Sequence, residues 1–150
     1  MLKQKINVKL LLIFLAVFTA YAVAVMLLAH GKFRVNPSFS PFRQISFYLV
    51  VGLVEELVYR GWALNAFSAV TSYRKALILA GIFFVLLHWP AYIIRFFLSG
   101  TFAVTQFILQ SLLVLVLGLL FGYVFGKNRS IWTIIILHAY FDAIVDLLAG

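Results

Sequence analysis

Long apolar stretches constrain this chain more than any other feature of its sequence. Five runs of about 20 mostly apolar residues follow one another, and each is long enough to cross the hydrocarbon core of a bilayer as a helix. A lipid-exposed backbone must satisfy its own hydrogen bonds, and the sequence shows no strand pattern. We therefore predict an all-α, polytopic transmembrane helical bundle of about five spans, at residues 10–29, 44–69, 76–97, 104–126 and 131–149.

The composition supports a membrane protein rather than a soluble one. Hydrophobic residues make up 65% of the chain and charged residues 11%, against about 25% charged in an ordinary soluble domain. At 150 residues the chain is short enough for one integral-membrane domain over residues 1–150. It contains no cysteine, which excludes disulfides, thiolate metal ligands and a cysteine nucleophile.

The net charge of +8 would suggest nucleic-acid binding in a soluble protein. Here the basic residues lie mainly at the ends of apolar runs, where membrane topology and anionic lipid headgroups favour them, so we expect no nucleic-acid partner. The first run is longer than the apolar core of a signal peptide, so we interpret it as a retained span. Placing the N-terminus in the cytoplasm puts seven loop cations inside and four outside, which favours a multi-pass cell-membrane protein with that orientation.

Six acidic or histidine side chains lie within the predicted spans. An ionisable group near the bilayer centre costs roughly 2.5–3.5 kcal/mol on insertion scales, so we expect these side chains to converge on one another rather than face lipid. They are Glu55, Glu56, His88, His138, Asp142 and Asp146.

The spacing of these residues favours convergence from three helices. Glu56 and Arg60 are i,i+4 neighbours that can pair on one helix face. Glu55 points about 100° away from Glu56, toward the predicted bundle centre. On the span 76–97, Phe84 precedes His88 by about one turn.

The last span carries its ionisable residues in one stripe. His138, Asp142 and Asp146 fall at i, i+4 and i+8, which places them on one face of a helix. Asp146 lies close to the predicted end of the span, where it can reach the headgroups. We therefore leave Asp146 out of the predicted site.

Three short motifs carry a resemblance to a known family. They are Glu55-Glu56-Leu-Val-Tyr-Arg60, Phe84-Val-Leu-Leu-His88 and His138-Ala-Tyr-Phe-Asp142. In this order the motifs resemble the EExxxR, FxxxH and HxxxN or HxxxD pattern of the CPBP family of intramembrane proteases. That family includes the CAAX prenyl endopeptidases of the Rce1 type and the bacterial Abi proteins. The resemblance places a protease-like core at residues 44–149.

The resemblance implies an intramembrane endopeptidase and a role for each motif. Glu55 with His88 would activate a water to attack the scissile carbonyl. His138 and Asp142 would stabilise the oxyanion, Asp142 standing where many relatives carry asparagine. Glu56 and Arg60 would support the first motif structurally.

Cofactor, substrate and reaction class leave alternatives open. Glu55, His88 and His138 could supply a three-ligand zinc site, or they could run a metal-free water attack. The substrate would be a prenylated CAAX-type protein or a small peptide or leader, met within the membrane lipid. A non-catalytic bacteriocin-immunity or partner-binding protein is the second hypothesis, and a proton or ion pathway is the third.

Overall fold

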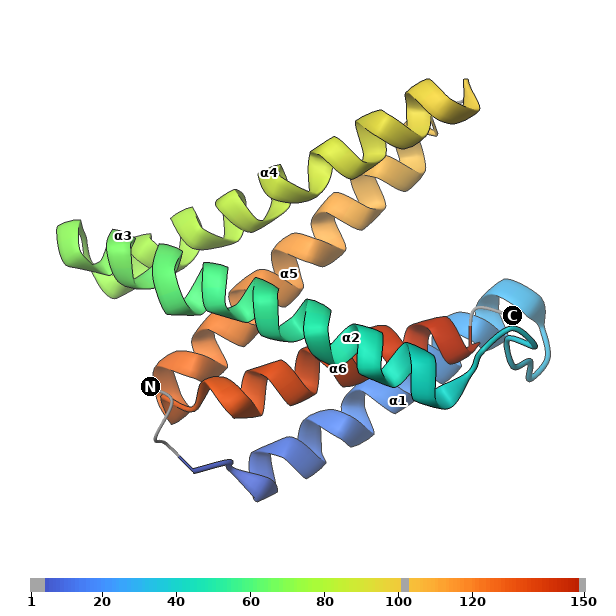
Figure 1. The fold of residues 1–150 in the computed structure, drawn as a ribbon, viewed down its shortest axis with the longest axis horizontal. Helices are drawn as coiled ribbons and strands as arrows, with labels where there is room; N and C mark the ends of the chain where they lie inside the picture. The colour runs from blue at the N-terminus through green and yellow to red at the C-terminus, as the bar shows by residue number, and fades with distance from the viewer. Residues whose placement is uncertain (1–4, 101–102, 149–150) are drawn as a thin grey trace. The chain divides into compact units, whose positions relative to one another are not determined.

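The chain folds into helices only, over the part that the structure describes. The computed structural model describes residues 5–100 and 103–148, and every regular element there is a helix (Figure 1). The helices, in chain order, are α1 (Val8–His30), α2 (Pro41–Glu56), the π-helix η1 (Leu57–Ala63), α3 (Leu64–Val70), α4 (Tyr73–Ser99), α5 (Val104–Asn128) and α6 (Ile131–Leu148). The predicted all-α class is confirmed.

Four of these helices are long and apolar enough to cross a membrane: α1, α4, α5 and α6. They correspond to four of the five predicted spans. The remaining prediction, residues 44–69, falls on α2, η1 and α3, where helical backbone continues from residue 41 to residue 70 but changes from α to π and back. A π-helix inside an α-helix is rare and frequently marks a functional site.

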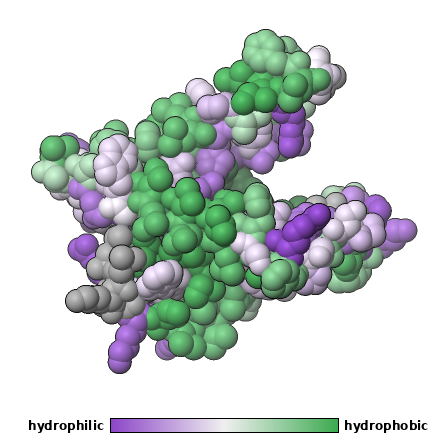
Figure 2. All heavy atoms as spheres, in the orientation of Figure 1, coloured by the Kyte–Doolittle hydropathy of each residue, from purple (hydrophilic) through white to green (hydrophobic). Residues whose placement is uncertain are grey.

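Apolar side chains cover much of the exterior. Figure 2 shows broad hydrophobic areas on the visible face, and many large apolar residues on every long helix are exposed, among them Leu28, Phe42, Leu98 and Leu109. A soluble monomer rarely exposes contiguous apolar surface on this scale. Lipid therefore accounts for the surface, and the chain is a multi-pass membrane protein.

The described chain divides into two compact units. Unit 1 comprises residues 1–57 and 128–150, and unit 2 comprises residues 58–127. In unit 1, α6 packs against both α1 and α2 (Figure 1), and buried residues occupy most of its circumference. A helix that is buried on most sides is the core of its bundle. The last helix is thus the centre of unit 1.

Polar contacts fix α1 and the 31–40 loop to α6. The hydroxyl groups of Thr19 and Tyr140 are hydrogen-bonded to each other. At the other end of α6, the backbone N–H of Asn36 donates to the carbonyl of Leu147 at 2.8 Å, and the Asn36 side-chain amide donates to the Asp146 carboxylate at 3.2 Å. These bonds hold both neighbours in register with α6.

Unit 2 contains α3, α4 and most of η1 and α5. α3 packs against α4, and α4 meets α5 where the hydroxyl of Tyr73 donates to the carbonyl of Gly122 at 2.7 Å. Arg60 of η1 is buried, donates to the carbonyl of Gly118 at 3.0 Å, and lies against the ring of Phe84. Glycine at the helix interface leaves the backbone carbonyl open to these donors.

Candidate functional site

His138 lies at the centre of the largest group of ionisable side chains in unit 1. Its ring is almost completely buried on α6, and its Nδ1 lies 2.8 Å from Oε1 of Glu56, which has no exposed side-chain surface. An ionised carboxylate can only accept a hydrogen bond, so with Glu56 ionised it is Nδ1 that carries the proton. A contact of this kind sets the tautomer and the ring orientation of a histidine.

The other ring nitrogen of His138 faces two further carboxylates. Nε2 lies 3.7 Å from Oε2 of Glu55 and 3.6 Å from Oδ2 of Asp142. Both of these side chains keep 28% of their surface exposed. The two distances exceed a direct hydrogen bond and suit a bridging water. Unit 1 therefore contains one imidazole with a buried acid at Nδ1 and two partly exposed acids near Nε2.

The two adjacent glutamates reach opposite nitrogens of the same ring. Glu55 and Glu56 are consecutive on α2, so their side chains leave the helix about 100° apart. That divergence lets Glu56 reach Nδ1 while Glu55 lies near Nε2. On α6, Asp142 follows His138 by one turn and so lies on the same face.

In unit 2, the second motif forms a local arrangement around His88. Nδ1 of His88 lies 2.7 Å from the carbonyl oxygen of Phe84, one turn earlier on α4. The Phe84 ring meets the imidazole edge to face, with centroids 4.6 Å apart. A carbonyl only accepts hydrogen bonds, so Nδ1 of His88 carries the proton and Nε2 is the nitrogen able to accept one.

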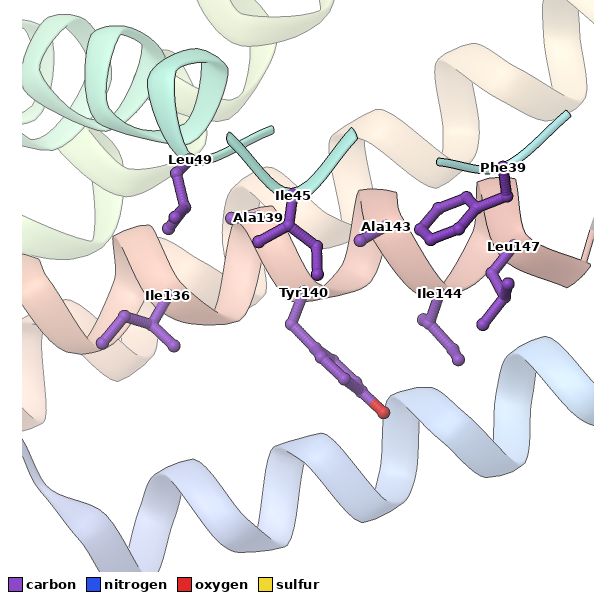
Figure 3. A pocket seen from close by; sticks show the side chains of 9 residues that line it. All are labelled: Phe39, Ile45, Leu49, Ile136, Ala139, Tyr140, Ala143, Ile144 and Leu147. Atoms are coloured by element: carbon purple, nitrogen blue, oxygen red, sulfur yellow. The ribbon is translucent and has the colours of Figure 1, made fainter. Parts of the chain in front are cut away.

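An apolar cavity lies along the seam between α2 and α6 in unit 1. Its volume is about 290 Å³, and its walls are almost entirely hydrocarbon. Ile45 and Leu49 reach it from α2, and Phe39 covers it from the preceding loop (Figure 3). The α6 wall includes Ala139, the residue that directly follows His138. The cavity is thus suited to an apolar group next to a polar cluster.

The structure brings Glu55, His138 and Asp142 together in unit 1. It places His88 in unit 2 with Phe84, and Arg60 in unit 2 as well. Glu56, which the sequence assigns to support with Arg60, also contacts His138. No sequence spacing signals that contact, because it joins residues 82 positions apart on two helices.

The zinc site considered from the sequence draws its side chains from both units. Among residues 5–100 and 103–148, no group of three or more histidine, aspartate or glutamate side chains is placed to hold a metal ion. Glu55 and His138 lie in unit 1 and His88 lies in unit 2, so the three-ligand zinc site stays a prediction.

Comparisons with known proteins identify the family. A family model described as type II CAAX prenyl endopeptidase Rce1-like matches residues 37–144, more than two thirds of the chain. A search of curated proteins and a search of solved structures each give no match. All three motifs lie within the matched range, and the resemblance that they carry is confirmed. The chain belongs to the type II CAAX prenyl endopeptidase Rce1-like family, a family of intramembrane proteases.

Proposed function

We propose that this chain is an intramembrane endopeptidase in which Glu55 activates a water molecule to hydrolyse a peptide bond. The observation that carries the proposal is the convergence of Glu55, Glu56 and Asp142 on the two nitrogens of His138. Family membership supports CAAX-type proteolysis in general. The arrangement of acids around one imidazole supports this particular chemistry.

Glu55 is the proposed general base. Its side chain is partly exposed, its Oε2 is buried, and its own helix positions that oxygen beside Nε2 of His138. Glu55 takes a proton from the water as the water oxygen bonds to the scissile carbonyl carbon. Glu55 then returns that proton to the leaving amine as the carbon–nitrogen bond breaks, which gives one carboxyl product and one amine.

His138 and Asp142 are proposed to stabilise the oxyanion. When both ring nitrogens carry protons, Nδ1–H donates to Glu56 and Nε2–H can donate to the developing oxyanion. Asp142 lies on the Nε2 side, where it either orients the ring or, when protonated, donates a hydrogen bond of its own. Buried Glu56 holds the ring in place throughout.

His88 is proposed to assist Glu55 in positioning the water. The hydrogen bond from its Nδ1 to the Phe84 carbonyl leaves Nε2 as the proton-accepting nitrogen. That tautomer suits a residue that orients a water or shares its proton. The assignment rests on the FxxxH motif and on this local geometry; Arg60 is proposed to support the first motif from η1.

The substrate is proposed to carry an apolar group beside the scissile bond. The cavity between α2 and α6 offers a hydrocarbon-lined space whose wall includes the neighbour of His138. Either a prenyl group or an aliphatic part of a peptide or leader would suit it. Paired peptides with and without a prenylated cysteine distinguish these substrates by their KM values.

Replacement of Glu55 tests the mechanism. In proteoliposomes, Glu55→Gln is expected to lower kcat by about 10²- to 10⁴-fold, because the amide cannot take the proton. Asp146→Asn, an acid-to-amide change two turns beyond His138, is the matched control and keeps wild-type turnover. Cleavage by Glu55→Gln at wild-type rate would overturn the mechanism and favour a partner-binding protein.

The same assay tests whether a metal takes part. A chelator is expected to leave cleavage unchanged, because the proposed base is a carboxylate. Loss of cleavage on chelation, restored by added zinc, would overturn the metal-free route.

We further propose that the two units act as one membrane domain with a cytoplasmic N-terminus. The chain has no native cysteine, so single cysteines can be introduced in the 31–40 and 127–130 loops without interference. In intact cells, a membrane-impermeant thiol reagent is expected to label the first loop only. The reverse labelling would contradict this orientation.

A further inference from the structure

Gly52 lies on α2 one turn before Glu56, where α2 passes close to the backbone of α6. A Cβ atom at this position would stand 3.1 Å from the carbonyl oxygen of Ile135 and 3.4 Å from the backbone nitrogen of Ala139. It would also stand 3.6 Å from the Cβ of His138. The first distance is tighter than nine in ten real Cβ contacts, so a methyl group here requires its neighbours to give by a few tenths of an ångström.

The atoms that a methyl group would meet belong to the turn that carries His138. In an α-helix the carbonyl of residue 135 accepts the hydrogen bond of the N–H of residue 139. A methyl group at position 52 would therefore press on one backbone hydrogen bond of α6, directly beside His138. Backbone atoms cannot rotate away as the end of a side chain can, so the two helices would have to separate by a few tenths of an ångström.

Separation at this point would act on the contact between Glu56 and His138. That hydrogen bond measures 2.8 Å and joins α2 to α6 one turn from Gly52. Hydrogen bonds of this type weaken steeply as they lengthen, and both groups are buried. The imidazole depends on this bond for its orientation toward Glu55 and Asp142.

We propose that Gly52 is a positioning residue for catalysis, because its missing side chain lets α2 approach α6 closely enough for Glu56 to hold His138. The proposal rests on the catalytic role proposed above for His138. It adds a requirement for glycine at a position outside the three motifs. Gly52 acts through the two helices and touches no reacting atom.

The test compares Gly52→Ala with Gly81→Ala in proteoliposomes. A Cβ at Gly81 would meet the ends of the Leu119 and Leu115 side chains, at 3.0 and 3.3 Å, which can move. We expect Gly52→Ala to lower kcat by about tenfold with little change in KM, since a 1 Å misplacement can cost about 10²-fold. Gly81→Ala is expected to keep wild-type kcat.

Two readouts separate positioning from a general loss of packing. In ¹⁵N-histidine NMR spectra, Gly52→Ala is expected to shift the Nδ1–H resonance of His138 and leave that of His88 unchanged. The double variant Gly52→Ala, Glu56→Gln is expected to be no slower than Glu56→Gln alone, because both changes act on one contact.

Several results would overturn the proposal. These are an unchanged His138 resonance, fully additive effects in the double variant, an equal loss of kcat in Gly81→Ala, or failure of Gly52→Ala to fold. The last result would make Gly52 a determinant of the whole bundle rather than of one contact. The NMR readout needs no substrate, so it decides the effect of Gly52 on His138 even if the wild-type chain cleaves no peptide.

Discussion

The two histidines of the motifs are held in different ways in the two units. In unit 2, the Nδ1 of His88 lies 2.7 Å from a backbone carbonyl of its own helix, four residues earlier. In unit 1, the Nδ1 of His138 lies 2.8 Å from a side-chain carboxylate on another helix, 82 positions away in sequence. The distances are nearly equal, but one contact is local and the other is tertiary.

This difference decides what each histidine depends on. The acceptor for Nδ1 of His88 is in place wherever α4 is helical, because it belongs to the backbone. The orientation of His138 is fixed only while α2 packs against α6 and Glu56 is present to accept. The Nδ1 contact of His138 should therefore be sensitive to changes on α2, whereas the Nδ1 contact of His88 should persist when side chains on its own helix change.

The largest expected effect in this comparison comes from Glu56. Glu56→Gln is expected to lower kcat by about 10- to 100-fold, as is usual for a residue that orients a functional histidine. The amide can present an N–H group toward Nδ1 and so favour the opposite tautomer. Turnover in proteoliposomes measures the loss, and the ¹⁵N spectrum of His138 should report the change of tautomer.

The control for Glu56 is again Asp146→Asn, which removes a charge from the end of α6. It should leave both kcat and the His138 spectrum unchanged. If Glu56→Gln kept wild-type turnover, His138 would not depend on its tertiary acceptor, and the contrast between the two histidines would have no functional meaning.

The fold follows from the sequence where length and hydropathy decide it. The spans predicted at 10–29, 76–97, 104–126 and 131–149 correspond to α1, α4, α5 and α6, each within three residues at either end. The π-helix at Leu57–Ala63 was not predicted. A turn of π-helix adds a residue without changing hydropathy. In so short a segment, the spacing of the apolar residues therefore does not distinguish π-helix from α-helix.

The site follows from the sequence only where its contacts are local. The i,i+4 spacing of His138 and Asp142 predicts their shared face, and the spacing of Phe84 and His88 predicts their contact. The hydrogen bond between Glu56 and His138 depends on which helices are neighbours. Spacing along one helix holds no information about that.

The smallest expected effect concerns the local contact in unit 2. Phe84→Leu removes the edge-to-face packing on His88, and such contacts contribute about 0.5–1.5 kcal/mol beyond their buried area. The backbone carbonyl of residue 84 remains, so the hydrogen bond to Nδ1 of His88 should persist. We expect kcat to fall by only about 2- to 10-fold, since 1.4 kcal/mol corresponds to a factor of ten.

A neighbouring phenylalanine provides the control for this smaller effect. Phe83 packs on Tyr59, Trp62 and Phe67, so Phe83→Leu reports the general cost of losing an aromatic ring from unit 2. Phe84→Leu should shift the ¹⁵N resonances of His88 without changing its tautomer, and Phe83→Leu should leave them in place. A change of tautomer in Phe84→Leu would mean that the ring, rather than the backbone of α4, holds His88. In that case both histidines would depend on side-chain packing, and the helix backbone alone would not explain the spacing of phenylalanine and histidine in the second motif.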